Sequence, residues 1–320
     1  MRSLFISTVI LSLSLGLAWT RFTKEPNKIG DNEVLVMPAQ ESDLEIIEWL
    51  TEKADIRISK KQDNLGTYLW VEYTDKKDPE KPQSKTYKAG ENGNVLIKEL
   101  SPLIGIRTIE NPSLQDLGLD TPKTTLQITK NGQIRKFFIG NETYGTKDLY
   151  VQDTDNNDVF LIDDKKFRNL INGRTALPDR ALFSYDTKTA TSATISVIRE
   201  NISKTTHLQH QYWQDASKAT WTYQETPDLD NTQLQTWMEK LLKLSNARYI
   251  SPEDDAGNFQ EIFQMELQWE GKAPQHLIIY KDPNDPTKNL WAKSEHTREY
   301  VKITSNGLQE LLDDMTTVFP

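Results

Sequence analysis

The segment Thr146-Lys147-Asp148-Leu149-Tyr150 recurs 141 residues later as Thr287-Lys288-Asn289-Leu290-Trp291. The same shift aligns apolar positions on both sides of that segment: Leu100 with Leu241, Leu126 with Leu267, Ile162 with Ile303 and Leu170 with Leu311. Self-similarity at one fixed spacing is typical of a structural unit that is built more than once. The sequence therefore predicts two tandem copies of one module.

Each copy is predicted to begin with two or three strands, the last of which carries a tryptophan. Upstream of the strongest match the spacing grows, and this alignment pairs Trp70 with Trp221. The extra residues of the first copy lie in Thr74–Lys85, a charged and proline-containing run without apolar anchors. Such a run is typical of a loop, and we expect an inserted surface loop there.

A helix is predicted after the tryptophan strand. In the second copy it covers 231–244, with Asp230 or Asn231 as the N-cap, because apolar residues recur there at helical spacing. These residues are Leu234, Trp237, Met238, Leu241 and Leu242. Their spacing favours a core position for Trp237.

Short strands and a closing helix are predicted to complete each copy. The turns between the strands are rich in Asn, Asp and Gly, as antiparallel hairpins require. The strands are expected over 125–129, 136–139, 149–152 and 159–162 in the first copy and over 264–269 in the second, with closing helices over 165–170 and 305–313. Because strands and helices do not alternate strictly, the predicted class is α+β with mainly antiparallel sheets.

The chain is predicted to have three parts: an N-terminal membrane segment over 1–21, a first repeat over 22–187 and a second repeat over 188–320. The stretch from Leu4 to Trp19 has no charge and is flanked by Arg2 and Arg21. As a helix it spans roughly 24 Å, less than the roughly 30 Å of a bilayer core. A cleaved signal peptide and an uncleaved anchor with Trp19 at the interface both fit, and the anchor is favoured.

The soluble part is expected on the extracytoplasmic side of the membrane. The tail before the apolar stretch is only three residues long, and export of the long part that follows is usual for such a start. The basic residues Arg21, Lys24 and Lys28 oppose that orientation under the positive-inside rule.

Composition excludes several classes of function. The net charge of −9 argues against nucleic-acid binding, which needs a concentrated basic face. The chain has no cysteine, which excludes disulfides, a lipid-modified N-terminal cysteine, thiolate zinc sites and a cysteine nucleophile.

No catalytic, cofactor or metal site is predicted. Asp153, Asp155 and Asn157 match the first ligands of an EF-hand loop, but position six is Asp158 instead of glycine, so a polar hairpin turn is favoured. His207 and His210 lie in a strand-like segment and are interpreted as surface residues. Adjacent acidic pairs such as Asp163-Asp164 are interpreted as solvated.

Exposed aromatic residues are the stronger candidates for binding. Five of the eight tryptophans lie in the second copy. Trp213 and Trp269 are not explained by the repeat or by a helical stripe, so they are the candidates for an exposed partner contact.

Short motifs in the first copy carry a resemblance to a known family. They are Leu117-Gly118-Leu119-Asp120-Thr121-Pro122, the stretch from Ile139 to Gly145, and Leu149-Tyr150-Val151. With the N-terminal segment and the tryptophan strand, the chain resembles domain-of-unknown-function family 4340. In the second copy, Phe259–Phe263 replaces the Gly-Leu-Asp-x-Pro element.

The resemblance implies a bacterial envelope protein, often encoded beside auxiliary subunits of gliding-motility-type ABC transporters, and it implies no catalytic residues. We therefore expect a non-enzymatic accessory module on the periplasmic side of a bacterial inner membrane, with subunits of an ABC-type transporter or another envelope complex as protein partners. Candidate contact residues are Gly118, Asp120, Pro122, Trp213 and Trp269. Two alternatives are a module that binds cell-wall glycan or lipid, and a hydrolase with an unrecognised site.

Overall fold

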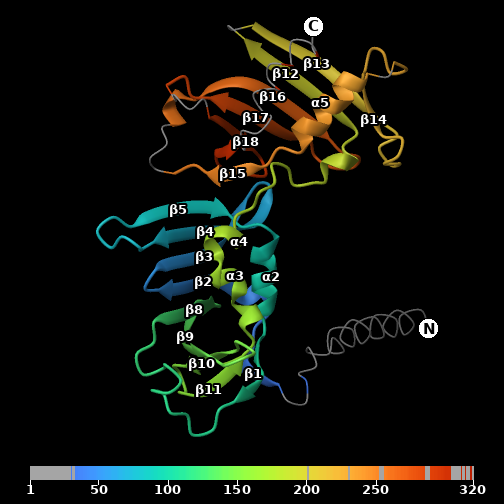
Figure 1. Cartoon of the computed structure of the whole chain (residues 1–320). Coiled ribbons are helices and arrows are strands. Elements are labelled where there is room, and N and C mark those ends of the chain that lie inside the picture. The colour runs from blue at the N-terminus through green and yellow to red at the C-terminus, as the bar shows by residue number, and fades with distance from the viewer. Residues whose placement is uncertain are drawn as a thin grey trace, which may run out of the picture.

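The computed structural model describes residues 30, 33–199, 202–229, 231–251, 256–284 and 289–303, and the single positions 311, 314 and 318. The predicted membrane segment over 1–21 and most of the predicted helix over 305–313 lie outside these residues. None of the helices in the described part is long and apolar enough to cross a membrane. Two antiparallel sheets, one in each half of the chain, organise the fold (Figure 1).

The first sheet has nine strands in the order β5-β4-β3-β2-β8-β9-β10-β11-β7. Their bounds are β2 (Leu44–Thr51), β3 (Ala54–Asp63), β4 (Gly66–Asp75), β5 (Gln83–Lys88), β7 (Arg107–Thr108), β8 (Thr124–Lys130), β9 (Gln133–Glu142), β10 (Leu149–Asp153) and β11 (Val159–Ile162). A separate antiparallel pair joins β1 (Val34–Met37) to β6 (Leu103–Gly105).

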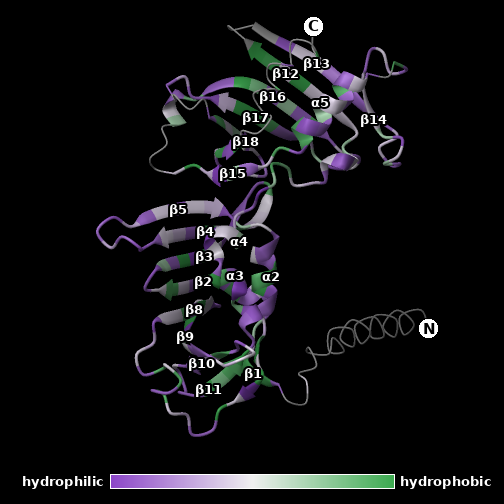
Figure 2. Ribbon diagram, in the orientation of Figure 1, coloured by the Kyte–Doolittle hydropathy of each residue, from purple (hydrophilic) through white to green (hydrophobic). Residues whose placement is uncertain are grey.

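Helices cover one face of the first sheet (Figure 1). They are α2 (Glu91–Glu99), α3 (Arg168–Ile171) and α4 (Gly173–Ala176), with 3-10 turns η1 (Glu41–Asp43) and η2 (Asp164–Lys166). Apolar side chains from both layers form the core; the rings of Trp49 and Phe167, for example, stack with centroids 5.8 Å apart. Hydrophilic residues dominate the β4–β5 loop at the sheet margin (Figure 2). The predicted closing helix over 165–170 is confirmed as the short series η2, α3 and α4.

The second sheet has eight strands in the order β14-β13-β12-β16-β17-β18-β19-β15. Their bounds are β12 (Ser192–Arg199), β13 (Ile202–Gln211), β14 (Thr220–Tyr223), β15 (Asn246–Tyr249), β16 (Gln260–Gln268), β17 (Gln275–Lys281), β18 (Leu290–Ser294) and β19 (Val301–Ile303). Two 3-10 turns, η3 (Thr187–Thr189) and η4 (Ala256–Asn258), also belong to this half.

The predicted helix of the second half is confirmed as α5 (Thr232–Leu242). The side chain of Asn231 accepts a hydrogen bond from the Leu234 N–H at 2.9 Å, so Asn231 is the N-cap. Trp237 is buried, and its Nε1 donates to the carbonyl of Leu311 at 2.9 Å. Its predicted core position is therefore confirmed.

The two sheets have the same strand order when each element is matched by its place in the chain. Strands β4, β3, β2, β8, β9, β10, β11 and β7 occupy the places that β14, β13, β12, β16, β17, β18, β19 and β15 occupy. Strand β5 has no counterpart. The loop predicted over Thr74–Lys85 is wrong in extent, because β4 runs to Asp75 and pairs with β5 from Gln83. The first half therefore has an additional edge strand, β5, which forms a hairpin with β4.

The predicted equivalence of Trp70 and Trp221 is wrong by one residue. Leu69 and Val71 belong to the core of the first sheet, so Trp70 between them points to the opposite face. Trp221 instead points into the core of its own sheet. A shift of one residue reverses the face of a strand side chain, which is why two buried tryptophans at a similar place have different roles.

Candidate functional site

The predicted contact element around Gly118 is a compact turn. The N–H of Gly118 donates to the carbonyl of Gln115 at 3.1 Å, and the N–H of Leu119 donates to that of Leu114 at 2.7 Å. Gly118 has φ +69°, a left-handed conformation that glycine adopts without steric cost. The side chain of Leu119 is buried.

This turn packs against the end of β9, where the second family motif lies. The backbone N–H of Asn141 donates to the Leu117 carbonyl at 2.8 Å, and its Nδ2 donates to the Asp116 carbonyl at 3.2 Å. A Cβ on Gly140 would lie 2.2 Å from the Leu117 oxygen, so only glycine fits. The two motifs are thus two surfaces of one contact. Within it Gly118 shapes the turn, half-buried Pro122 precedes β8, and Asp120 is exposed.

The two tryptophan candidates differ in exposure. Trp269 is only 4% exposed, packs on Phe183 and Tyr185, and donates from Nε1 to the Asp186 carbonyl at 3.0 Å. Its prediction as an exposed contact residue is wrong, because the connector covers its ring. Trp213 is half-buried and borders a cavity of about 540 Å³.

His207 and His210 lie on β13. His207 is exposed, but the interpretation of His210 as a surface residue is wrong. Its ring stacks on Trp221 with centroids 4.4 Å apart, and its Nδ1 donates to the Ala190 carbonyl at 2.8 Å. Burial lowers the pKa of His210, so the neutral ring is favoured.

The predicted hairpin turn after β10 is confirmed. Asp153 is fully buried and forms an ion pair with Arg135, and its carbonyl accepts from the Asn157 N–H at 2.9 Å. Among the described residues, no group of three or more His, Asp or Glu side chains is placed to hold a metal ion.

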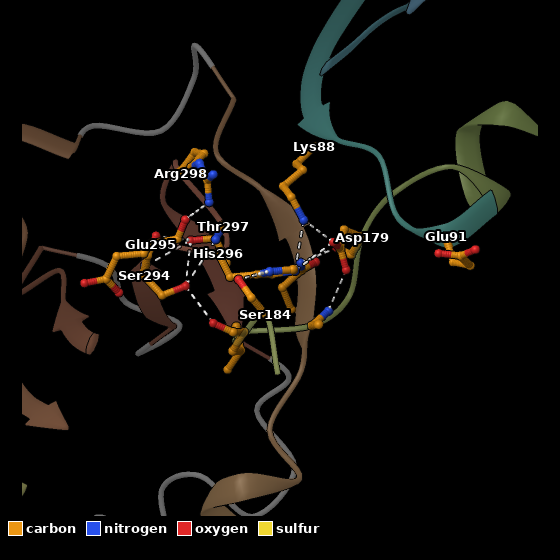
Figure 3. Close-up of polar contacts among 12 residues, drawn as sticks. Lys88, Glu91, Asp179, Ser184, Ser294, Glu295, His296, Thr297 and Arg298 are labelled. Carbon is orange, nitrogen blue, oxygen red and sulfur yellow. Dashed lines mark hydrogen bonds and ion pairs between the residues drawn. The ribbon is translucent and has the colours of Figure 1, made fainter. Parts of the chain in front are cut away.

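A group of polar side chains joins the two halves of the chain (Figure 3). We call it the interdomain cluster: Lys88 at the end of β5, Asp179 and Ser184 in the connector over 177–191, and His296 in the β18–β19 turn. Nε2 of His296 donates to Oδ2 of Asp179 at 2.7 Å, and its Nδ1 lies 3.0 Å from Oγ of Ser184. Lys88 forms an ion pair with the same oxygen of Asp179.

The electrostatics of the cluster favour the ionised form of Asp179 in spite of its burial. Burial alone would raise the pKa of Asp179, but the hydrogen bond and charge of His296 and the amine of Lys88 hold that pKa well below its usual range. Burial lowers the pKa of Lys88, and the Asp179 carboxylate opposes this shift. The carboxylate of Asp179 therefore stays ionised and accepts from Lys88 of the first half and from His296 of the second half.

A second ion pair lies beside the cluster. Arg298, also in the β18–β19 turn, pairs with Asp63 at the end of β3, and its guanidinium lies 4.9 Å from the centroid of the Tyr68 ring. Arg298 has φ +64°, and Asn157, the residue 141 positions earlier, has φ +62°. Asparagine adopts this left-handed conformation more readily than arginine does. At Arg298 the less favourable backbone conformation therefore coincides with the ion pair to Asp63 in the other half.

Aromatic rings complete the contact. Trp70 on β4 meets Tyr249 on β15 edge to face with centroids 6.3 Å apart, and Tyr87 on β5 lies at the same distance from Tyr249. Figure 1 shows β5 and β15 side by side at the meeting edges of the two sheets. Trp70 points away from the core of the first sheet, and its ring is therefore part of the contact between the halves.

One comparison with known proteins gives a match. The family model described as Domain of unknown function (DUF4340) matches residues 97–260, about half of the chain. The chain belongs to the DUF4340 family. No curated protein and no solved structure matches it. The matched residues run from α2 to the start of β16 and so include the connector with Asp179 and Ser184.

The composition of the cluster in this DUF4340 chain invites comparison with a hydrolase triad, since a serine, a histidine and an aspartate are linked in series. In a triad the aspartate orients the ring while donors at the serine stabilise an oxyanion. Here Asp179 also holds Lys88, and the backbone N–H of Ser184 donates to Oε1 of Gln275 at 2.8 Å. The arrangement is better suited to joining segments than to acyl transfer.

Sequence reasoning missed this site. Lys88 and His296 are 208 residues apart, and no motif in the sequence connects them. The one available signal was Arg298, which stands where the repeat has Asn157.

Proposed function

We propose that this DUF4340 chain is a non-enzymatic interaction module on the periplasmic side of the bacterial inner membrane. In this proposal the segment over 1–21 anchors the chain, and the two sheet units serve as an accessory part of an ABC-type transporter or another envelope complex. The observation that carries the proposal is the interdomain cluster, whose titratable side chains are engaged with one another across the two halves.

The second element of the proposal is a tandem duplication. It is supported by the identical order of corresponding strands and by the matching left-handed residues Asn157 and Arg298. Two copies fixed by ion pairs and buried aromatic rings offer a partner a surface larger than one module provides. On that surface Asp120 and Trp213 are the candidate contact residues, and Gly118 and Pro122 maintain the turn that presents Asp120.

A hydrolase is the second candidate, because Ser184, His296 and Asp179 are linked by hydrogen bonds. The engagement of Asp179 by Lys88 and of the Ser184 N–H by Gln275 favours the structural role. Ser184→Ala separates the two: a hydrolase loses turnover of a nitrophenyl ester, whereas an interaction module has no such activity above a heat-denatured control.

The test of the interaction module is recovery of its partner. The tagged chain is purified in mild detergent from membranes of its own host, and bound proteins are identified by mass spectrometry. The expected result is stoichiometric recovery of transporter or other envelope subunits. The control is the tagged segment over 1–21 without the two sheet units. A chain that is purified alone after chemical cross-linking would contradict the proposal.

Anchoring is tested separately. The chain is expected to stay with the membrane after carbonate washing. Added protease is expected to digest it once the outer membrane is permeabilised. A soluble form beginning near Trp19 would instead identify a cleaved signal peptide.

A further inference from the structure

A cavity of about 540 Å³ lies beside α5 in the second half, and we call it the α5 pocket. Its volume is within the roughly 300–1,000 Å³ of small-molecule sites. It is lined by η3, by residues of β13 and β14, by the loop between these strands and by α5 with Lys243 after it. Figure 1 shows α5 next to β13 and β14.

The first feature that identifies an occupant is an unpartnered ring nitrogen in the wall of the pocket. His210 is only 7% exposed, its ring stacks on Trp221, and its Nδ1 donates to the Ala190 carbonyl. Nε2 has no hydrogen-bond partner among the described residues, yet it is not sealed in the core, and His210 borders the pocket. Because Nδ1 carries the proton and burial lowers the pKa of the ring, Nε2 is an acceptor for an N–H or O–H group of an occupant.

The second feature is aromatic surface that the fold leaves open. Trp213 in the β13–β14 loop borders the pocket and is only half-buried, whereas Trp221 is 2% exposed and offers no open surface. The small apolar side chains of Ala216 and Ala219 line the same pocket. The negative face of an indole attracts the positive C–H groups of a ring that lies flat on it, and small side chains leave room for a methyl group.

Charge does not select the occupant. Lys188, Glu239 and Lys243 are exposed at the rim, and the last two form an ion pair at 3.9 Å. A hydrocarbon chain would leave Nε2 of His210 unpaired, and an anion would bring a second acceptor against it. A metal ion would need further ligands, and no group of three or more His, Asp or Glu side chains in the described part is placed to supply them. A neutral ligand with donor groups fits best.

We propose that the α5 pocket binds a neutral N-acetylated pyranose sugar. One C–H face of the sugar lies on Trp213, a hydroxyl or amide N–H donates to Nε2 of His210, and the acetyl methyl lies toward Ala216. The side-chain amide of Gln214 is exposed and has no partner among the described residues, so it is available to the acetamido group. Trp213 then serves a glycan, and Asp120 remains the candidate contact for a protein partner. The site uses neither the anchor nor a transporter subunit, so its test is independent of the proposed function.

The experiment measures binding of N,N′-diacetylchitobiose by saturation-transfer NMR. The full chain is held in phosphatidylcholine nanodiscs without glycoside detergents, because a sugar headgroup would compete for the site, and empty discs are the blank. The disaccharide is expected to bind saturably above the blank. Mannitol, which has hydroxyl groups but no ring face, is expected not to bind. At constant pH the ¹⁵N resonance of His210 Nε2 is expected to move to lower frequency as this nitrogen accepts a hydrogen bond.

Variants locate the site. Trp213→Ala is expected to weaken binding by about tenfold, whereas Tyr212→Ala, which removes a 65% exposed ring that does not border the pocket, leaves it unchanged. His210→Phe keeps a ring against Trp221 without Nε2 and is expected to weaken binding by about fivefold. Trp213→Ala changes only a loop residue, so it decides the outcome if His210→Phe lowers the melting temperature. No binding above the blank, equal binding of mannitol, equal weakening by Trp213→Ala and Tyr212→Ala, or an unmoved Nε2 resonance would each overturn the proposal.

Discussion

Arg298 in the β18–β19 turn holds Asp63 at the end of β3 through two hydrogen bonds, from Nε to Oδ2 at 2.6 Å and from Nη2 to Oδ1 at 3.2 Å. The two residues are 235 positions apart and belong to different sheets. A two-point contact between a planar guanidinium and a carboxylate fixes orientation as well as distance. Together with the His296–Asp179 contact, it sets the β18–β19 turn against the first half at two places.

The first prediction concerns this pair. Arg298→Ala and Asp63→Ala are each expected to lower the melting temperature by a few degrees and to increase proteolysis of the connector over 177–191. The double variant is expected to add little to either single variant, because both remove the same interaction. Arg57→Ala, which breaks a pair with Glu48 inside the first sheet, is the control and leaves connector proteolysis unchanged. Additive effects in the cycle would show that the two side chains act independently.

The second prediction is a pH dependence at His276 on β17. Its ring bonds Glu295 through Nδ1 at 2.7 Å and Glu266 through Nε2 at 3.0 Å. Burial alone would lower the pKa of His276, but the two carboxylates outweigh it and raise that pKa above 6.5. A raised pKa means that the charged ring stabilises the fold below the unfolded value and that this stability is lost as pH rises through the folded value.

Glu266 acts in the opposite sense. Its hydrogen bond with Gln268, and then its contacts with His276, lower its pKa below 4.5, so its contribution is lost only as pH falls through that lowered pKa. Both contributions are therefore complete between about pH 4.5 and 6.5. His276→Gln is expected to lower the melting temperature most at about pH 6 and least at about pH 9, with exposed His207→Gln as the control. An equal loss at both values would exclude the charged ring as the cause.

Local patterns in the sequence were sufficient for the α+β class, for α5 and for the strand β11 over Val159–Ile162, while the choice between Asp230 and Asn231 as the cap of α5 needed the structure. They were insufficient where a distant segment decides the outcome. His210 looks polar along the chain, yet Trp221 on the neighbouring strand covers it; Trp269 looks free, yet Phe183 and Tyr185 of the connector lie on its ring. Contacts between the halves were beyond prediction because no periodicity links Lys88 to His296.

The third prediction follows from the one-residue difference between the two tryptophans. Trp221→Ala is expected to destabilise the second half by about 3–5 kcal/mol, as for other buried aromatic residues, because its ring fills the core against His210. Trp70→Ala removes a contact with Tyr249 instead, so it is expected to loosen the two halves while the first core stays intact. Hydrogen exchange distinguishes them: Trp221→Ala speeds exchange in β12 and β16, and Trp70→Ala speeds it in β5 and β15. Faster exchange in β2 and β8 of the Trp70→Ala variant would instead show that Trp70 stabilises the core of the first sheet.

The last prediction separates presentation from contact in the family motif. Gly140→Ala places a Cβ 2.2 Å from the Leu117 carbonyl oxygen, so the turn must move, and we expect the free energy of unfolding to fall by about 1–3 kcal/mol as for other overpacked sites.

Asp120 is exposed and makes only a local bond with Thr121 at 3.3 Å among the described residues, so Asp120→Ala is expected to change the free energy of unfolding by no more than about 0.5 kcal/mol. If Asp120 contacts the partner, its variant recovers less partner from membranes at an unchanged melting temperature. Asp116→Ala, exposed in the same turn, is the matched control, since only its backbone carbonyl serves Asn141. Full recovery with Asp120→Ala and reduced recovery with Gly140→Ala would mean that the turn matters for its shape and that the partner binds another surface, with Trp213 as the remaining candidate.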